Sequence, residues 1–283
     1  MSVSVIITVF NKTAHVRNVL MSLNSQTVQP DEVVLADDGS AEDIIKGIED
    51  IIPRCQYKLK HVWQEDKGFR VAKSRNNGAR HATGDYLVYF DQDIVFTKHY
   101  LEQILTHRRE RHFYAGYPIW LTEEQTKKVS PAILESCDFS QIATEEQIKT
   151  IVKQYWKERL YTFLHTYGLR RIGPSLRSCG CSFYKSDFIY VNGFDETYQQ
   201  WGYEDDDLGV RLHAAGIKGF NPIKTEYALH CYHPQAPRGT NGRSLNRPGF
   251  KAKEKTYNRQ NYRCEYGYDN PLGQDTVRVS ELN

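Results

Sequence analysis

The chain has 283 residues, of which 40% are hydrophobic and 25% are charged, the composition of a folded globular protein with room for one large α/β domain or two small ones. Its 37 Lys and Arg nearly balance 35 Asp and Glu, which gives no indication of a nucleic-acid partner. With no apolar run near the ~20 residues that a membrane-spanning helix needs, and an apolar start (VSVIITVF) unlike a signal peptide, we expect a cytoplasmic protein with free cysteines.

The N-terminal third alternates β-rich runs with helical patterns. Strands are predicted at 3–10, 32–40, 57–64 and 85–93, and helices at 13–27, 42–52 and 70–82. The run at 3–10 is continuous and β-branched, which is typical of a strand buried on both faces. Strands that alternate with helices predict a parallel sheet whose ligands gather at the carboxyl ends of the strands.

The rest of the chain is less regular. Residues 122–171 have a mostly helical pattern, and 179–196 predict a strand, a short helix and a glycine turn. An acid cluster then begins a helix that ends near Gly216. From about residue 235 the chain is polar and is interpreted as a lid or tail.

Acidic residues follow three of the predicted strands. Asp37 and Asp38 follow the second strand, Asp66 the third, and Asp91 and Asp93 the fourth. A domain core gains nothing from carboxylates that converge at one edge, so we expect a cation, or hydroxyls that need acceptors, beside them. This convergence is the strongest chemical signal in the sequence.

The acid cluster lies in the stretch WGYEDDDLGVRL at 201–212. The free N–H groups and dipole of a helix N-terminus favour acids, which explains Asp206 and Asp207. Asp207 also precedes Arg211 by four residues, a stabilising helical pair. Glu204 and Asp205 remain unexplained by helix formation alone.

Two further stretches leave alternatives open. Residues 153–171 interleave basic and aromatic residues, as in a helix that lies on an anionic lipid surface. An ordinary helix with its aromatic side packed inward is the favoured interpretation, because the charges do not segregate cleanly. The CGC at 179–181 offers thiol ligands for zinc, but its spacing fits no common zinc module.

Six segments, in this order, resemble the nucleotide-sugar-dependent glycosyltransferases of family 2. They are VSVIITVFN (3–11), VLADDGS (34–40), WQEDKGFRVAKSRNNGA (63–79), YFDQDIVF (89–96), WGYEDDDLGVRL (201–212) and CYHPQAPRG (231–239). The set is most similar to the N-acetylgalactosamine-transferring domain of bacterial chondroitin polymerases, and it also resembles the C-terminal module of β-1,4-galactosyltransferases. The resemblance implies a GT-A fold, a Rossmann-like nucleotide-binding mixed sheet flanked by helices.

The same resemblance implies an inverting, metal-dependent transfer. The donor would be a UDP-sugar (GalNAc, Gal, Glc or GlcNAc) and the acceptor a hydroxyl of a glycan or lipid-linked glycan in bacterial polysaccharide synthesis. Residues 1–240 would form the domain, with a nucleotide-binding half at 1–99 and an acceptor-binding half at 100–240, before a polar tail or lid at 241–283. A peripheral position at the inner face of the membrane is the alternative to a free cytoplasmic one.

The resemblance also implies roles for the acids at the strand ends. Asp93 would bind Mn²⁺ or Mg²⁺, and Asp91 would contact the donor ribose or the metal. His233 is the expected histidine ligand and His230 the alternative. Asp38 would accept the uracil N3–H. The other expected donor-site residues are Thr8, Phe10 and Asn11 at the end of the first strand, Asp66 near the uridine, and Arg75, which would compensate the acids or face the diphosphate.

Sugar transfer with inversion needs a base that takes the proton of the acceptor hydroxyl. The resemblance places that base in the ED pair, and we assign it to Asp205, with Glu204 hydrogen-bonded to a sugar. Related proteins have WGGED, whereas here Tyr203 replaces a glycine, which bears on acceptor or sugar specificity. Trp201 offers an apolar face for a sugar ring.

Two other functions are weighed. A nucleotidyltransferase making a nucleotide sugar would have a glycine-rich phosphate loop near the first strand, and TVFNKTA contains no glycine. A non-catalytic carbohydrate-binding module would leave the base motif and the nucleotide-contact acids unexplained.

Overall fold

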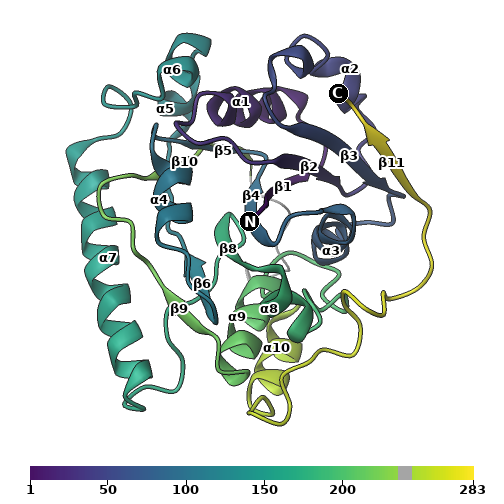
Figure 1. The fold of residues 1–283 in the computed structure, drawn as a ribbon, viewed down its shortest axis with the longest axis vertical. Coiled ribbons are helices and arrows are strands. Elements are labelled where there is room, and N and C mark those ends of the chain that lie inside the picture. The colour runs from purple at the N-terminus through teal and green to yellow at the C-terminus, as the bar shows by residue number, and fades with distance from the viewer. Residues whose placement is uncertain (235–243) are drawn as a thin grey trace.

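The computed structural model describes residues 1–234 and 244–283 and has two sheets (Figure 1). The large sheet contains β1 (Val3–Val9), β2 (Glu32–Asp37), β3 (Lys58–Gln64), β4 (Tyr86–Asp91), β6 (His112–Ala115), β8 (Gly180–Tyr184), β9 (Lys218–Phe220) and β11 (Val277–Glu281). Its eight strands run in the order β11-β3-β2-β1-β4-β8-β6-β9. The small sheet has the order β5-β10-β7, formed by β5 (Ile94–Phe96), β7 (Ile119–Trp120) and β10 (Ala228–His230). The expected mixed α/β architecture is confirmed.

Strand β1 is an inner strand of the large sheet and is buried on both faces. It pairs in parallel with β2 on one side and β4 on the other. Val5 and Ile7 point into one hydrophobic cluster, and Ile6 between them points into the other. This alternation explains the continuous apolar run, since neither face of the strand meets water. The carboxyl ends of β1, β2 and β4 consequently share one edge.

Helices cover both faces of the sheet (Figure 1). Their bounds are α1 Thr13–Asn24, α2 Ile44–Gly47, α3 Val71–His81, α4 Tyr100–Thr106, α5 Glu123–Lys127, α6 Pro131–Ser136, α7 Glu145–Thr166, α8 Lys185–Tyr190, α9 Glu204–Ala214 and α10 Arg247–Glu254. Side chains of α1, α4 and α6 join one core cluster, and those of α3, α8 and α9 join the other. Helix α9, which begins with the acid cluster, therefore packs on the same face as α3.

Three local predictions differ from the structure. The helix predicted at 42–52 is only α2, which ends at Gly47 and is followed by turns and a 3-10 turn at Ile52–Arg54 that contains Pro53. The strand predicted to 93 ends at Asp91 in a turn. The helical region 122–171 divides into α5, α6 and α7, of which α5 and α7 begin with Thr capping boxes.

The boundary predicted at residue 240 lies outside the described residues. Of the segment predicted as a tail or lid, α10 packs beside α9, and β11 pairs antiparallel with β3 at the edge of the large sheet. The segment is thereby joined to the core at two places. Among the described helices, none combines the length and apolar character needed to span a bilayer.

Candidate functional site

The end of β1 is tied to both neighbouring strand ends. The backbone N–H and carbonyl of Phe10 exchange hydrogen bonds with the side chain of Gln92, each at 3.1 Å. The Asn11 N–H donates to the Ser40 hydroxyl at 2.7 Å, and the Asn11 side-chain oxygen accepts from the N–H groups of Ala41 and Glu42 after β2. Asn11 and Lys12 both have positive φ, at 52° and 55°. The chain thus turns sharply here without glycine, and Phe10 is left 45% exposed at the edge.

Asp38 is buried at the end of β2. Its two carboxylate oxygens accept from Gln64 Nε2 at 2.6 Å and from the Arg70 N–H at 2.8 Å. Burial raises the pKa of Asp38 to about 7. Each oxygen keeps a second lone pair for another donor. The carboxylate of Asp66 accepts from the N–H of Gly68 in its own turn, and the backbone of Asp66 lies against Gly39, where a Cβ atom would be 2.6 Å away.

Arg75 on α3 connects three separate elements. Its Nε donates to Thr8 Oγ1 on β1 at 3.0 Å, its Nη2 to Asp91 at the end of β4 at 2.8 Å, and its Nη1 to Glu204 at the start of α9 at 3.0 Å. The guanidinium is buried, and its side chain is only 3% exposed. Of the two predicted roles for Arg75, the compensation of acids is the one that these contacts favour. Four predicted residues are thus brought together.

The ED pair differs from an ordinary helix start. Glu204 is 6% exposed, and one of its carboxylate oxygens has no hydrogen-bond partner among the described residues. Burial and the neighbouring charge of Asp205 raise the pKa of Glu204 to about 7, against the effect of Arg75. Burial also raises the pKa of Asp205, whose carboxylate accepts from the Asp206 N–H at 2.8 Å. A carboxylate with a raised pKa is a stronger base than one in water.

The pKa of the Cys179 thiol is raised by burial and by the charges of acids from three parts of the chain. Burial raises its pKa, and the carboxylates of Asp91, Asp205 and Asp93 raise it further. These acids come from the end of β4, the turn after it, and α9. All three act on the same thiol, which lies directly before β8. All six cysteines are free, as expected.

Asp207, the last residue of the acid cluster, forms the pair that its spacing from Arg211 predicts. Asp207 pairs with Arg211 Nε at 2.6 Å, and both side chains are fully buried. Asp207 also accepts from the hydroxyls of Tyr198 and Tyr257. This carboxylate is therefore structural and separate from the exposed edge.

Tyr203, at the position of the family glycine, has a φ of 76°, in the left-handed region that favours glycine. Its ring stacks on Phe250 of α10, with ring centroids 5.0 Å apart. Trp201 is 43% exposed, and its carbonyl accepts from the hydroxyl of Ser244. Both residues predicted to bind the acceptor therefore lie beside α10 or the segment directly before it.

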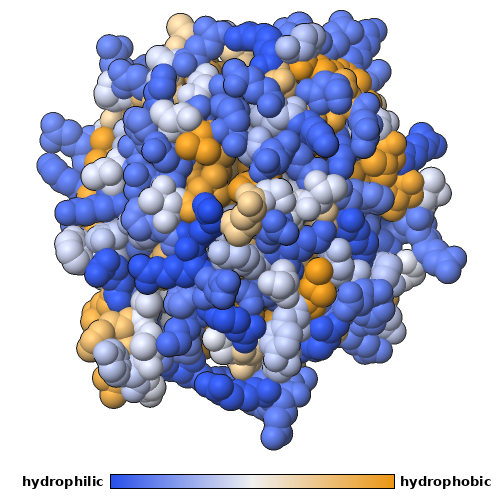
Figure 2. Space-filling view, viewed as in Figure 1, coloured by the Kyte–Doolittle hydropathy of each residue, from blue (hydrophilic) through white to orange (hydrophobic). Residues whose placement is uncertain are grey.

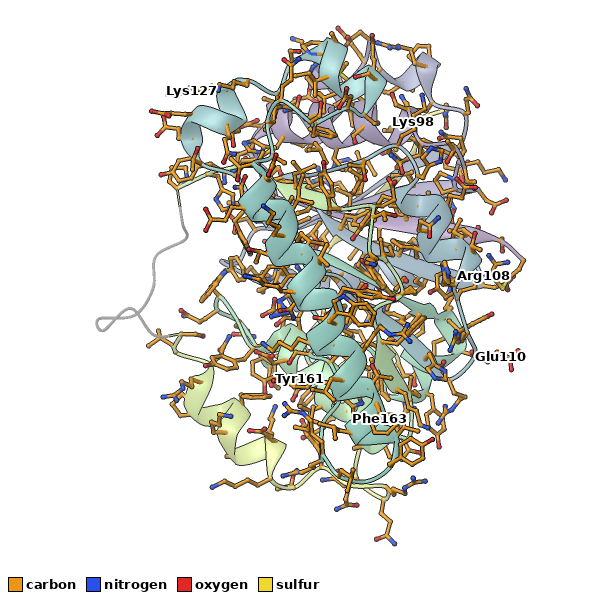
Figure 3. The ribbon with its side chains drawn as sticks, turned by 90° about the vertical axis from the view of Figure 1, so that its left-hand side faces the viewer. Lys98, Arg108, Glu110, Lys127, Tyr161 and Phe163 are labelled. Atoms are coloured by element: carbon orange, nitrogen blue, oxygen red, sulfur yellow. The ribbon has the colours of Figure 1, made fainter. Side chains whose placement is uncertain are left out.

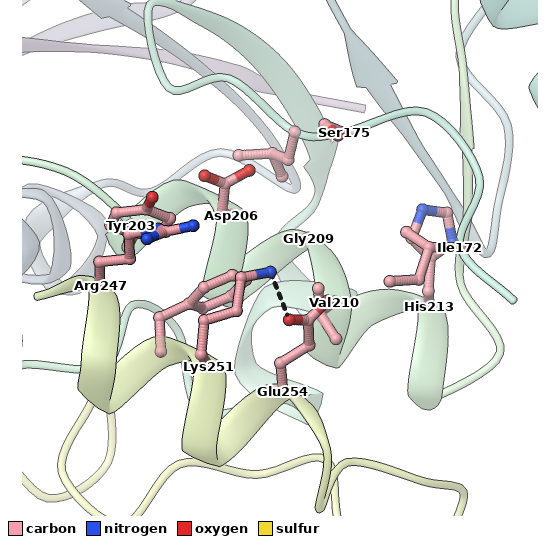
Figure 4. A pocket seen from close by; sticks show the side chains of 12 residues that line it. Ile172, Ser175, Tyr203, Asp206, Gly209, Val210, His213, Arg247, Lys251 and Glu254 are labelled. Carbon is pink, nitrogen blue, oxygen red and sulfur yellow. Dashed lines mark hydrogen bonds and ion pairs between the residues drawn. The ribbon is translucent and has the colours of Figure 1, made fainter. Parts of the chain in front are cut away.

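A cavity of about 390 Å³ opens on this side of α9 (Figure 4). Tyr203 and Asp206 line it from α9, and Arg247, Lys251 and Glu254 line it from α10. Lys251 is paired with Glu254 at 2.8 Å. In the close-up, the Arg247 side chain extends toward Tyr203 and Asp206. The walls thus combine aromatic surface with charges of both signs.

The metal-ligand candidates Asp93, His230 and His233 form one cluster, with their ligand atoms within 4.8 Å of one another. Nε2 of His233 lies 3.0 Å from one carboxylate oxygen of Asp93, and Nε2 of His230 lies 3.5 Å from the other. In residues 1–234 and 244–283 this is the only such group of His, Cys, Asp and Glu, so the thiols of Cys179 and Cys181 join none.

The hydrogen bonds of the two rings fit a metal site. Nδ1 of His230 bonds the Cys231 carbonyl at 3.0 Å, and Nδ1 of His233 bonds the Pro234 carbonyl at 2.8 Å. A carbonyl only accepts, so each Nδ1 carries the hydrogen and each Nε2 of a neutral ring presents a lone pair. These lone pairs face the carboxylate of Asp93, whose buried Oδ1 has no hydrogen-bond partner among the described residues. A cation fits this donor set.

Three residues beside the site were missed by the sequence analysis. Gln92, between the two acids of the DQD, holds Phe10. The ring of His15 lies edge-on to His233 with centroids 6.5 Å apart, and the indole of Trp120 lies against His230 at 4.1 Å. Gln92 lay within a recognised motif, whereas nothing in the local sequence marks His15 or Trp120.

Comparison with protein families gives two matches. The model described as Glycosyl transferase family 2 matches residues 4–189, more than half of the chain, and the N-terminal domain of galactosyltransferase matches 158–234. The chain is 31% identical over 228 residues to a validoxylamine A glucosyltransferase of Streptomyces hygroscopicus subsp. limoneus, covering 76% of this chain and 48% of the relative. It is 32% identical over 248 residues to a chondroitin synthase of Pasteurella multocida, covering 82% and 25%. The chain spans half or less of these relatives.

Solved structures show the same fold. A mannosyltransferase from Pyrobaculum calidifontis, solved with GDP-Man and Mn²⁺, has a TM-score of 0.56 at 16% identity, covering 83% of this chain and 58% of its own. GalNAc-T7, solved with UDP, GalNAc and Mn²⁺, has a TM-score of 0.56 at 17% identity, covering 84% and 44%. The expected GT-A fold is confirmed.

Proposed function

The chain belongs to glycosyl transferase family 2, and from that premise we propose that it transfers a sugar, with inversion, from a UDP-sugar to a hydroxyl of a glycan or lipid-linked glycan. The observation that carries the proposal is the placement of Arg75. One buried guanidinium bonds Thr8, Asp91 and Glu204, so the acid motif of α9 adjoins the strand ends where a nucleotide would lie.

On the donor side, Asp38 would accept the uracil N3–H with its free lone pairs, and Asp66 and the turn at Phe10 and Asn11 would border the nucleoside. Asp93, His233 and His230 would hold the divalent cation, with Asp91 beside the ribose or the cation. When bound, the ion would neutralise charge on the leaving diphosphate. Two imidazole ligands favour Mn²⁺ over Mg²⁺, which takes oxygen ligands.

On the acceptor side, Asp205 would be the general base. The acceptor oxygen forms a bond to the anomeric carbon, the bond from that carbon to the diphosphate breaks, and the hydroxyl proton passes to Asp205. UDP leaves with the bonding electron pair, and attack from the opposite side inverts the configuration. The raised pKa of Asp205 supports this role, since it strengthens the base. Glu204, fixed by Arg75, would bond a sugar hydroxyl.

The cavity between α9 and α10 is lined by Asp206, the residue after Asp205, and we take this side as the acceptor position, although Glu204 and Asp205 do not themselves line the cavity. Tyr203 forms one wall of it, and Trp201 lies just before Tyr203 in the chain. A sugar acceptor suits such walls because sugar rings pack on aromatic faces and their hydroxyls bond to charged groups.

The substitution Asp205→Asn tests the proposal. A general base contributes about 10²–10⁴-fold to rate, so release of UDP from the donor in the presence of acceptor and Mn²⁺ should fall by that factor. Calorimetric binding of UDP should be unchanged, because Asp205 contacts no nucleotide in this scheme. Turnover at the unsubstituted rate would remove Asp205 from the role. Since relatives are named a glucosyltransferase and a chondroitin synthase, UDP-Glc and UDP-GalNAc are the first donors to compare, followed by UDP-Gal and UDP-GlcNAc.

The nucleotidyltransferase alternative receives no support from the loop after β1. That loop turns through Asn11 and Lys12 and has no glycine, so it lacks the close backbone approach of a phosphate loop. Pyrophosphate release from UTP and a sugar phosphate would revive this alternative. Saturable sugar binding without turnover on any UDP-sugar would favour a carbohydrate-binding module.

A further inference from the structure

Helix α7 exposes a row of apolar side chains along its outer face. Trp156, Leu160 and Phe163 are 55%, 53% and 54% exposed, and Tyr167, directly after the helix, is 67% exposed. Spacings of four, three and four residues place them on one side of the helix. In the space-filling view, apolar atoms reach the surface at the lower left, over α7 (Figure 2). We call these residues, with Leu169, the α7 row.

The inner face of α7 is already filled by other residues. Only Ile151, Tyr155 and Glu158 of this helix are buried. The interpretation that the aromatic side packs inward is therefore wrong for the α7 row. An apolar row that the fold leaves exposed at this density needs an explanation beyond packing.

The charges beside the row are mostly basic, and among them Lys149 is paired with Glu145 in the first turn of α7. Between residues 147 and 171 the only acid is Glu158, which is buried and accepts from Gln154 and Asn221. The exposed charged residues of this stretch are Lys149, Lys153, Lys157, Arg159, Arg170 and Arg171. Lys224, from outside the helix, lies over the Trp156 ring at 5.5 Å. The surface is thus apolar along its middle and basic along its borders.

We propose that the α7 row is the contact by which this protein lies on an anionic lipid surface. Apolar side chains would enter the boundary between headgroups and acyl chains, and the bordering cations would pair with lipid phosphates, as in interfacial amphipathic helices. A second copy fits less well, because a symmetric contact would bring the two basic borders together. A glycan also fits less well, because Leu160 and Leu169 offer a sugar no stacking face.

The N-terminal end of α7 is connected to the candidate metal site. Gln147 donates to the Trp120 carbonyl at 3.1 Å, and the Trp120 ring lies against His230. Gln147 precedes Trp156 by nine residues, which places it on the opposite side of the helix from the α7 row. The α7 row thus faces away from that site, and lipid binding by the row does not depend on the proposed function.

Co-sedimentation with vesicles tests the proposal without any substrate, so its failure is distinguishable from failure of the proposed function. The chain should bind phosphatidylcholine vesicles that contain phosphatidylglycerol and should not bind phosphatidylcholine alone. Replacing two cations, as in Lys153→Gln with Lys157→Gln, should lower binding about 30-fold, which is about 2 kcal/mol at about 1 kcal/mol per cation. Leu160→Gln with Phe163→Gln should weaken binding at unchanged charge.

A matched control removes two cations away from the α7 row. Lys98 and Lys127 lie at the other end of the molecule from Tyr161 and Phe163 (Figure 3), and Lys98→Gln with Lys127→Gln should leave vesicle binding unchanged. A loss of vesicle binding in this control as large as that of the Lys153 and Lys157 variant would overturn the proposal, as would absence of binding to either kind of vesicle. Dimerisation in light scattering that Phe163→Gln abolishes would assign the row to a second copy instead, and stronger binding to soluble dextran sulfate than to vesicles would assign it to a polyanionic glycan.

Discussion

Replacing Glu204 by Gln should change how the stability of the fold depends on pH. Glu204 is buried beside Asp205, and these surroundings raise its pKa to about 7 from 4.5. Gln has nearly the same shape, and its amide oxygen can still accept the hydrogen bond from Arg75. The substitution therefore removes a titrating group while keeping the contact between α3 and α9.

The sign and size of the effect follow from proton linkage. Below about pH 4.5 the carboxyl is protonated in both the folded and the unfolded chain; between there and pH 7 the folded chain keeps a proton that the unfolded chain has lost. The stability due to Glu204 is therefore present at low pH and lost as pH rises through 7. A pKa of about 7 in place of 4.5 corresponds to roughly 3 kcal/mol in the free energy of unfolding. Asp38, whose pKa is also raised to about 7, titrates in both proteins and cancels in the comparison.

Urea unfolding of the two proteins at about pH 5 and about pH 8 measures this difference. From about pH 5 to about pH 8, the free energy of unfolding of the unsubstituted protein should fall by roughly 2–3 kcal/mol more than that of Glu204→Gln. Glu123→Gln, at an exposed side chain of α5, controls for the loss of one charge and should follow the unsubstituted protein. An equal fall in the free energy of unfolding of Glu204→Gln and of the unsubstituted protein would refute the reasoning, because it would mean that burial does not hold the proton on this carboxyl.

Two further predictions concern the metal cluster and a structural ion pair. His233→Ala and His230→Ala should each weaken binding of Mn²⁺ in calorimetry, His233→Ala more strongly because its Nε2 lies nearer to Asp93; unchanged affinity in both would contradict the proposed ligand set. Arg211→Met should lower the free energy of unfolding by about 3–5 kcal/mol, because it leaves the carboxylate of Asp207 buried without its partner. Urea unfolding measures that loss, and a change below 1 kcal/mol would mean that water reaches the pair.

The central strands were predictable because their local sequence reports their surroundings. A strand between two others, covered on both faces, is apolar at most positions, and in β1 the two polar residues, Ser4 and Thr8, have hydrogen-bond partners. Edge strand β11 lacks such a signal. Its side chains are mostly exposed, and its pairing with β3 joins segments far apart in the sequence, such as Val279 and Val62. The short segment 277–281, in which only Val277 and Val279 are apolar, predicts a tail unless that distant partner is known.

The residues of the candidate site also differ in whether local sequence predicts their positions. Residues at strand ends, such as Asp38 and Asp91, are placed together by parallel pairing, so the sequence alone predicts their convergence. The contact of Glu204 with Arg75 depends on where α9 lies relative to α3, which no local pattern encodes; the family resemblance implied a place in the site for both residues but did not pair them. The contact of Trp120 with His230 could not be predicted from local sequence, because it requires the pairing of β7 with β10, which are far apart in the chain.

Tyr203 has a strained backbone conformation, and its ring forms part of the wall of the cavity between α9 and α10. A non-glycine residue in the left-handed region costs about 1–2 kcal/mol, and an aromatic pair such as that with Phe250 contributes about 0.5–1.5 kcal/mol beyond its buried area. The stacking thus offsets much of the strain, and it does so only if α10 is in place. The same ring is a wall of the cavity that also contains Asp206. A glycine here would relieve the strain and enlarge the cavity, so Tyr203 in WGYED, in place of the second glycine of WGGED, restricts the cavity and makes its shape depend on α10.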